Sequence, residues 1–307
     1  MKKTYSKKSL NIEQQIKHIK NNKFEISDKD VLYQFLSVNP YQRIQYYFSK
    51  TPNATTSCLI NIYEFDAELK TTLFRYLSKI EISLRAALTN YVCQDHGAYW
   101  ISDESFFFGG YVSKNIGSIK SNVESEKKKK HSFISKHYEK YDNFPPVWKV
   151  VEVLSFSLLS KIYSSLDTQK VVSKRKITTD VYGIPVLGDR KKSPEDILSS
   201  WLHAISNLRN ICYHYEPLWG RNLNVLPYLP KPDGKLSNDL WTPSGTSKKA
   251  YVVLCSIRYL MNNIDSKNTL SMELVSLSDR YGLKEQDLHK YLDFEKRWHH
   301  QPLWAQK

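Results

Sequence analysis

The sequence predicts an all-α protein from three observations: its apolar periodicity, its small content of turn residues and its length. Apolar residues recur at steps of three and four over long stretches, which is the spacing of one face of a helix. Only 10 of the 307 residues are Gly and 12 are Pro, too few for a fold built from many β-turns. A chain of this length buries a sizeable core without disulfides, as one large helical domain or two modest ones.

The longest predicted helix is the segment 60–93. Its apolar positions, from Leu59 to Leu88, recur at helical spacing with charged residues between them. The sequence His-Gly at 96–97 follows as a natural end, because glycine suits the residue just after a helix. Two shorter helices and two proline breaks are expected before it: 12–19, 28–36, Pro40 and Pro52.

Two later helices have marked starts. The proline pair at 145–146 opens a predicted helix to Ile162, because proline in a first turn removes no helical hydrogen bond. The sequence Ser-Pro-Glu-Asp at 193–196 is a stronger start, since serine caps the helix and two carboxylates meet the positive end of its dipole. We expect this second helix to run to about Tyr215.

The remaining segments complete an expected division into three regions. A charged stretch at 121–131 indicates a solvated helix face or loop, with a phosphate-contacting patch as the alternative. A Pro- and Gly-rich loop follows at 227–248, and the last predicted helices are 248–264, 272–281 and 286–298. The regions are an N-terminal helical part, a core and a C-terminal helical part: 1–56, 57–226 and 227–307.

Cysteine usage and the N-terminus indicate a cytoplasmic protein. Four cysteines stand singly, without the spacing of a zinc site: Cys58, Cys93, Cys212 and Cys255. The basic N-terminus is followed by polar residues rather than the apolar stretch of a signal peptide, and no apolar run is long enough to span a bilayer. We therefore expect reduced thiols, no membrane partner, no metal and no cofactor.

The charge balance points to a polyanionic partner. The chain carries 45 Lys and Arg against 31 Asp and Glu, a net charge of +14. Such an excess attracts nucleic acids, with an affinity that falls as salt rises. Lysine-rich proteins encoded by AT-rich genomes share this composition, which is the other explanation. Six basic residues between 166 and 192 predict a loop or short helix that forms the lip of an RNA groove: Lys174, Arg175, Lys176, Arg190, Lys191 and Lys192.

The helix that starts at 193–196 has two distinct faces near its end. At about 100° per residue, one stripe is apolar and is expected to face the core. The opposite side is polar and aromatic, with Arg209 at the border. The core stripe is Trp201, Ile205, Leu208, Cys212 and Tyr215, and the other face carries Asn207, Asn210, Tyr213 and His214. A helix buried on all sides would not carry this set, so the polar face is expected to line a cleft or meet a partner.

The spacing of Arg209 and His214 suits phosphodiester cleavage without a metal. Histidine can move a proton to or from a ribose 2′-OH or a leaving 5′ oxygen. Arginine stays charged and can hold the phosphoryl oxygens as charge develops. One Arg and one His supply half of an acid and base pair, so a second copy in a homodimer is expected to face the first. By itself an Arg-x4-His spacing also occurs by chance, on solvated surfaces without function.

A longer stretch around the pair carries a resemblance. The segment 208–221, Leu-Arg-Asn-Ile-Cys-Tyr-His-Tyr-Glu-Pro-Leu-Trp-Gly-Arg, resembles the signature of the Abi (abortive infection) family, in the branch of AbiD and AbiF. The segments Ile-Tyr-Glu-Phe-Asp-Ala-Glu-Leu at 62–69 and Ile-Glu-Ile-Ser-Leu-Arg at 80–85 are similar to two further blocks of that family, as is the region 133–156. The chain departs from the pattern at Lys70 and Ser157, where the family tends to have Arg and Gly.

The resemblance implies a fold and an activity. The Abi family consists of phage-defence proteins of the HEPN class. The resemblance therefore implies a HEPN-like helical bundle with additional N- and C-terminal helices. Many HEPN domains are dimeric, metal-independent ribonucleases with an Arg-x4-6-His motif. By this likeness Arg209 and His214 would be catalytic and Asn210 would support them. Glu81, Arg85 and Tyr213 would be supporting residues, and Arg221 would join the RNA-binding set. Association with a small structured non-coding RNA is also implied.

Three functions remain open at this point. The first is a dimeric endoribonuclease, the second a non-cleaving RNA-binding protein that forms a ribonucleoprotein, and the third a scaffold that uses the polar face for dimerisation alone. Catalysis and binding ask for the same Arg and His side chains. Glu81 and Arg85 also have the spacing of an ordinary helix salt bridge.

Overall fold

The computed structural model describes residues 8–22, 24–52, 54–109, 112–185, 192–229 and 247–305. Within these residues every element of regular secondary structure is a helix, and two isolated β-bridges are the only strand-type pairing. The predicted all-α class is confirmed. No helix in the described ranges is both long enough and apolar enough to cross a membrane.

The helices fall into groups along the chain. The first group is α1 (Ile12–Asn21), α2 (Lys29–Val38) and α3 (Tyr41–Lys50), followed by α4 (Thr56–His96). The middle group is α5 (Val112–Lys127), α6 (Phe133–Tyr138), α7 (Val147–Val150), α8 (Phe156–Ser165) and α9 (Ser173–Lys176). The last are α10 (Pro194–Tyr213), α11 (Ala250–Ile264), α12 (Leu270–Arg280) and α13 (Glu285–Leu292).

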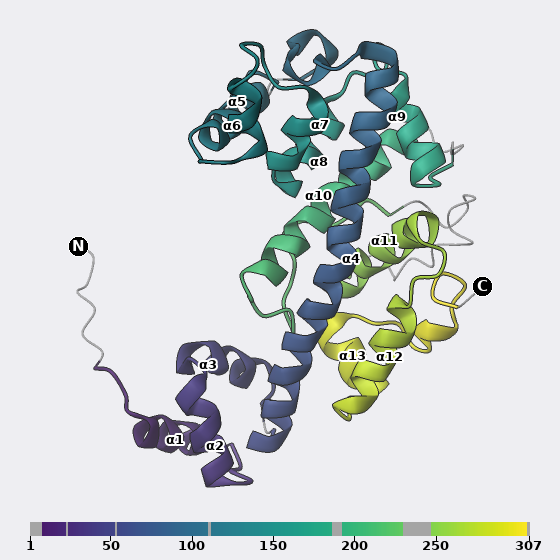
Figure 1. Cartoon of the computed structure of the whole chain (residues 1–307). Helices are drawn as coiled ribbons and strands as arrows, with labels where there is room; N and C mark the ends of the chain where they lie inside the picture. The colour runs from purple at the N-terminus through teal and green to yellow at the C-terminus, as the bar shows by residue number, and fades with distance from the viewer. Residues whose placement is uncertain are drawn as a thin grey trace, which may run out of the picture.

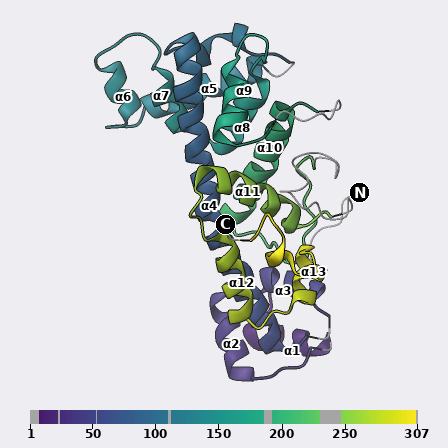
Figure 2. The ribbon, with the colours of Figure 1, turned by 90° about the vertical axis from the view of Figure 1, so that its right-hand side faces the viewer.

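Helix α4 is the axis of the molecule (Figures 1 and 2). Its 41 residues span about 60 Å at 1.5 Å per residue. α1–α3 lie at one end of it and α5–α9 at the other, while α10 crosses its middle (Figure 1). The Thr55 side chain caps its first turn, and Gly97 ends it with a positive φ of 75° that suits glycine. The predicted long helix is therefore confirmed, four residues longer at its start.

Helix α10 packs its apolar side into the centre of the protein. Ser193 and Asp196 form the capping box at its start, with Pro194 in the first turn. Trp201, Ile205 and Leu208 are fully buried against α4, α8 and α11. One continuous apolar core joins the N-terminal helices, the middle group and the C-terminal helices. Burial on this scale fixes the position of α10 on α4.

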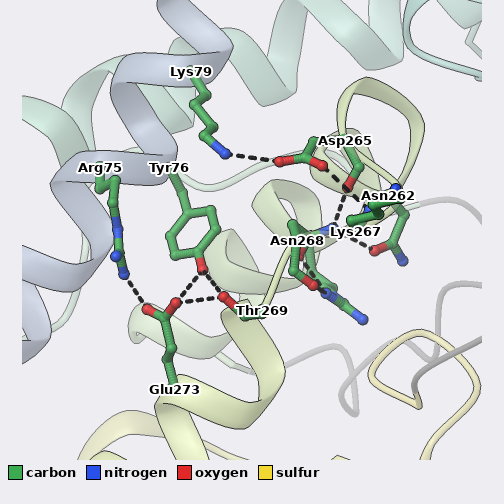
Figure 3. A network of polar contacts seen from close by, with 10 residues as sticks. Arg75, Tyr76, Lys79, Asn262, Asp265, Lys267, Asn268, Thr269 and Glu273 are labelled. Carbon is green, nitrogen blue, oxygen red and sulfur yellow. Dashed lines mark hydrogen bonds and ion pairs between the residues drawn. The ribbon is translucent and has the colours of Figure 1, made fainter.

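The C-terminal helices are fastened to α4 by a polar network, shown in Figure 3. Lys79 pairs with Asp265 at 2.7 Å, and Arg75 pairs with Glu273. Glu273 also accepts a hydrogen bond from the Tyr76 hydroxyl at 2.8 Å. This network holds one face of α4 over residues 75–79. Phe74, one residue before this stretch, contacts Arg209 and Tyr213 of α10.

Two predicted helices are interrupted in the structure. The segment 286–298 was expected to be one helix, but α13 ends at Leu292, where Asp293 takes a left-handed conformation with φ of 61°. The segment from 147 to 162 was expected to be continuous, but it breaks between α7 and α8, where Leu154 is extended and Ser155 caps α8. The break frees backbone carbonyls of the first segment. Arg85 of α4 donates hydrogen bonds to the carbonyls of Val151 and Leu154, at 2.9 and 3.0 Å. A side chain distant in sequence therefore satisfies the interrupted backbone.

Candidate functional site

The Arg209 and His214 side chains lie at the C-terminal end of α10, where the helix leaves the core. α10 ends at Tyr213, and His214 is its C-cap residue. The Arg209 side chain is 25% exposed, while His214 is exposed. Asn210 is half-buried beside them. Both members of the pair thus reach solvent from a helix that is otherwise anchored in the protein.

Arg209 is held between an acidic side chain and two aromatic rings. Its Nε atom lies 3.7 Å from Glu81 Oε2 on α4. The carbon of its guanidinium group lies 5.5 Å from the centre of the Phe74 ring and 4.9 Å from that of Tyr213. These distances allow cation–π attraction. The Nε atom is buried, and 3.7 Å is too long for a hydrogen bond, so the guanidinium is oriented without being tied to one acceptor.

Glu81 and Arg85 support Arg209 from α4. Glu81 is buried, and its Oε1 atom accepts a hydrogen bond from Arg85 Nη2 at 2.7 Å. Arg85 is in turn fixed by the two carbonyls at the break between α7 and α8. The carboxylate therefore has one oxygen on Arg85 and the other facing Arg209. This geometry is more than the i,i+4 salt bridge that the spacing alone predicts, because the pair extends to the guanidinium on α10.

Tyr213 connects the two members of the pair. Its ring lies under the Arg209 guanidinium, and its centre is 5.1 Å from that of the His214 ring, which it meets edge to face. Tyr213 is itself exposed. An aromatic ring at this place restricts both side chains while leaving their outer faces open to solvent.

Tyr215 differs from the prediction. The helical stripe placed it in the core, but its side chain is 52% exposed. The stripe fails because the helix ends at Tyr213, and Tyr215 takes a left-handed conformation with φ of 53°. The Glu216 N–H donates to the Ile211 carbonyl and the Tyr215 N–H to the Cys212 carbonyl, which is the Schellman pattern. The other expected core residues of the stripe are buried.

A buried carboxylate fixes the chain just after the motif. Asp66 of α4 is fully buried and accepts hydrogen bonds from the backbone N–H groups of Leu218 and Trp219, at 2.9 to 3.2 Å. It also accepts from the Tyr47 hydroxyl and pairs with buried Lys70 at 2.8 Å. Four partners satisfy its charge. Asp66 thereby ties the loop that follows His214 to the central helix.

A small pocket opens beside the pair. It has a volume of about 250 Å³ and is lined by Lys70, Thr71, Phe74, Cys212, Tyr213 and Tyr215. Burial raises the pKa of the Cys212 thiol to about 12, so the thiol is neutral and forms an apolar wall rather than a nucleophile. A larger cavity of about 700 Å³ lies elsewhere, where α5, α8 and the first half of α10 meet.

Only some of the basic residues predicted to border an RNA groove are free to contact RNA. Lys174 is 3% exposed and donates hydrogen bonds to the carbonyls of Ser164 and Leu166, so its ammonium group serves the interior. Arg175 is exposed but pairs with Glu195 at 2.8 Å. Arg221 pairs with Glu216 at 2.6 Å. Lys176 and Lys192 are exposed, whereas Arg190 and Lys191 lie outside the described residues.

The basic segment and the Arg/His pair lie at opposite ends of α10. Arg175 contacts Glu195 in the first turn of that helix, and Arg209 follows fourteen residues later. At 1.5 Å per residue this is about 21 Å along the axis. Within one chain, the structure therefore does not bring Arg175, which contacts the first turn of α10, to the pair. Glu81, Arg85, Asn210 and Tyr213 do lie with Arg209 and His214.

Sequence reasoning missed three contributors to the site. Asp66 and Lys70 stand among the charged residues that separate the apolar positions of the long predicted helix, yet they form a buried pair. Phe74 was not singled out, because an aromatic residue at helical spacing has no local sign of contact with an arginine on another helix. Their shared i,i+4 spacing was the available signal for Asp66 and Lys70. In the described parts of the chain, no group of three or more metal-ligating side chains is close enough to hold an ion.

Comparison with known proteins identifies one family. The model of the Abi-like protein family matches residues 33–220, well over half of the chain. No curated protein and no solved structure matches the chain. The matched span begins in α2 and ends after the loop bound by Asp66, so it contains α4, α10 and all the residues that surround Arg209.

Proposed function

Because this chain belongs to the Abi-like family of abortive-infection proteins, we propose that it acts in phage defence as a metal-independent endoribonuclease of the HEPN type. One observation carries the proposal. Arg209 and His214 reach solvent together at the end of α10, around the ring of Tyr213, while Glu81 orients the arginine from the interior. A charged clamp beside a proton carrier is what cleavage of an RNA strand requires.

The chemistry assigns one role to each side chain. His214 accepts the proton of a ribose 2′-OH as its oxygen attacks the adjacent phosphorus, and the bond to the 5′ oxygen breaks. Arg209 stabilises the negative charge that develops on the phosphoryl oxygens. The leaving 5′ oxygen takes up a proton, which leaves a 2′,3′-cyclic phosphate and a 5′-hydroxyl end. DNA is spared, because it has no 2′-OH to attack.

A homodimer completes the proposed site. A single chain contributes one His214, so a second α10 across a two-fold axis would supply the proton donor to the leaving oxygen. Exposed apolar side chains support a contact near the pair, since Ile82 of α4 and Tyr213 of α10 both lie open to solvent. The net charge of +14 supports RNA as the target. Membership of the family supports a small structured non-coding RNA as partner, and the free cysteines favour the cytoplasm.

The test uses the full-length protein and a labelled single-stranded RNA. Arg209→Ala and His214→Ala should each lower the cleavage rate by about 10²- to 10⁴-fold, with unchanged circular dichroism and melting temperature. EDTA should not inhibit, and the products should end in a cyclic phosphate. His203→Ala is a matched control, because His203 is exposed on the same helix and lines the distant large cavity.

Three results would count against a nuclease. Cleavage undiminished in both variants would end the proposal. Intact RNA that remains bound, with affinity lost in both variants, would favour the non-cleaving RNA-binding protein. Absence of any RNA effect, with a monomer formed by changes at the polar face of α10, would favour the dimerisation scaffold.

A further inference from the structure

The pocket beside the pair has an aromatic lining and no acidic side chain. Three of its six lining residues are Phe74, Tyr213 and Tyr215, and its one charged group is Lys70. Lys70 is already paired with Asp66, and its Nζ atom lies 5.8 Å from the centre of the Tyr215 ring. At about 250 Å³ the pocket is smaller than the ~300–1,000 Å³ of ordinary small-molecule sites. Its size and walls suit a single flat, uncharged ring system.

The backbone of Tyr215 is an independent sign of use. In the Schellman pattern the residue with positive φ is usually glycine, because a Cβ atom is strained there. Here that residue is a tyrosine with φ of 53°, and its ring is more than half exposed. The ring therefore contributes little burial to offset the strained backbone. Strained positions cluster at ligand sites, so a strained tyrosine that lines a pocket and exposes its ring is a reason to ask what the pocket binds.

The pocket also shares a wall with the proposed catalytic pair. Tyr213 lines it, and the same ring lies under the Arg209 guanidinium and meets the edge of His214. Phe74, a second wall, is the other ring beside Arg209, with its centre 6.4 Å from that of Tyr213. A ring bound in the pocket would lie one aromatic side chain away from a phosphate held by Arg209. In RNA, a base and a phosphate are joined at such short range.

We propose that this pocket, formed by Phe74, Tyr213 and Tyr215 with Lys70, Thr71 and Cys212, binds one unpaired nucleobase of the RNA strand whose phosphate Arg209 holds. The inference rests on the proposed action on RNA and adds the site that positions the strand. Aromatic side chains stack bases of any sequence, and the hydroxyl groups of Thr71, Tyr213 and Tyr215 can meet the base edge. Stacking would fix the nucleotide so that its 2′ oxygen is aligned for attack.

The experiment separates the base from the phosphate. Binding of the full-length protein is measured by fluorescence anisotropy with two labelled strands of equal length. One is 2′-O-methyl oligouridine, which cannot be cleaved, and the other is the same backbone without bases. The variants are Tyr215→Gly, Tyr215→Ala and Tyr215→Phe. Melting temperature and oligomeric state are measured for each variant under the same conditions.

We expect Tyr215→Gly and Tyr215→Ala to weaken binding of the oligouridine by about 5- to 150-fold and to change binding of the baseless strand much less. Tyr215→Phe keeps the ring and should keep the affinity. Folding provides the control: glycine tolerates the left-handed backbone, so Tyr215→Gly should melt above Tyr215→Ala. A loss of affinity common to both variants is then not explained by unfolding.

The outcomes distinguish this inference from the proposed function. Suppose that the wild-type protein cleaves RNA and that Tyr215→Gly binds oligouridine as tightly as the wild-type protein. The pocket is then not a base site, although the nuclease proposal stands. An equal loss of affinity for both strands also overturns the base site. A change confined to the oligomeric state overturns it as well, and indicates that a side chain of a second copy occupies the pocket. If the unchanged protein neither binds nor cleaves RNA, the proposed function fails and this inference with it.

Discussion

The two ends of α10 use charge in opposite ways. At the first turn, two of the three basic residues of α9 are already engaged: Lys174 donates to buried carbonyls and Arg175 pairs with Glu195. At the last turn, Arg209 has a carboxylate 3.7 Å away that is shared with Arg85, and it sits between aromatic rings. Of the described basic residues at the first end, Lys174 and Arg175 are therefore not free to meet a ligand, while Lys176 and Lys192 remain exposed.

This difference shows how charge should be interpreted in a basic protein. A net charge of +14 favours a polyanion over the whole surface, but it does not locate the contact. The location depends on which cations are already paired or buried. At the C-terminal end of α10 the exposed groups are an arginine, a histidine and tyrosines, which are the types that recognise unpaired RNA. Changing each end separately tests whether the comparison holds.

The largest effect is expected at the buried carboxylate that holds the C-terminal end. Asp66→Ala leaves four buried donors without their shared acceptor, and the ammonium group of Lys70 is then buried without a counterion. The free energy of unfolding should fall by about 3–5 kcal/mol. Urea denaturation followed by circular dichroism measures the change.

Glu68→Ala is the matched control for that change. Glu68 lies two residues further along α4, but its side chain is 42% exposed, in a surface pair with Arg280 and with a hydrogen bond from the Tyr281 hydroxyl at 2.8 Å. Its removal should cost about 0–1 kcal/mol. If both variants lose the same small amount, Asp66 does not anchor the loop after His214, and the C-terminal end is as loosely held as an ordinary surface.

An intermediate effect is expected at Lys174, at the other end. Lys174→Ala leaves the carbonyls of Ser164 and Leu166 without their donor, which should cost about 1–3 kcal/mol of unfolding free energy. RNA affinity should be unchanged, because the ammonium group does not reach the surface. Lys176→Ala, at an exposed neighbour, should leave stability within about 0.5 kcal/mol.

The pH dependence of the stability lost in Lys174→Ala gives a second measurement. Burial lowers the pKa of Lys174 from 10.5 to about 8. Below pH 8 the folded and unfolded chains both carry the proton, so Lys174 adds no slope. Between about pH 8 and 10.5 the unfolded chain holds a proton that the folded chain lacks, and the stability contributed by Lys174 therefore rises with pH. If the difference in unfolding free energy between the wild-type protein and Lys174→Ala is constant from pH 8 to 10.5, the burial of Lys174 is contradicted.

Local signals in the sequence were enough for most of the helices. The long α4 and the start of α10 follow from apolar spacing and from the capping sequence at 193–196, which act within one or two turns. The break after α7 could not be predicted, because its carbonyls are satisfied by Arg85, more than sixty residues away. Similarly, the burial of Asp66 depends on backbone groups at 218–219.

The site was predicted in part for the same reason. Arg209, Asn210, Tyr213 and His214 share the end of one helix, so the helical period brings them together without any tertiary information. Tyr215 was misplaced because the period was extended past the end of the helix. The basic segment looked like a groove lip because composition does not reveal which cations pair internally.

The smallest effect is expected for Arg175→Ala. Burial raises the pKa of the Glu195 carboxyl, but the hydrogen bond from Arg175 and those at the helix start outweigh it, so the net direction is downward. A lowered carboxyl pKa contributes stability that is present above the unfolded pKa and is lost as pH falls through the folded one. The free energy of unfolding of the variant should therefore fall by about 0–1 kcal/mol at pH 7, since Arg175 itself is 61% exposed, and acid unfolding should begin at a higher pH.

The affinity of Arg175→Ala for RNA should change little compared with the loss in Arg209→Ala. If the two losses are comparable, RNA runs along the whole of α10, and the contrast between its ends describes the free protein alone.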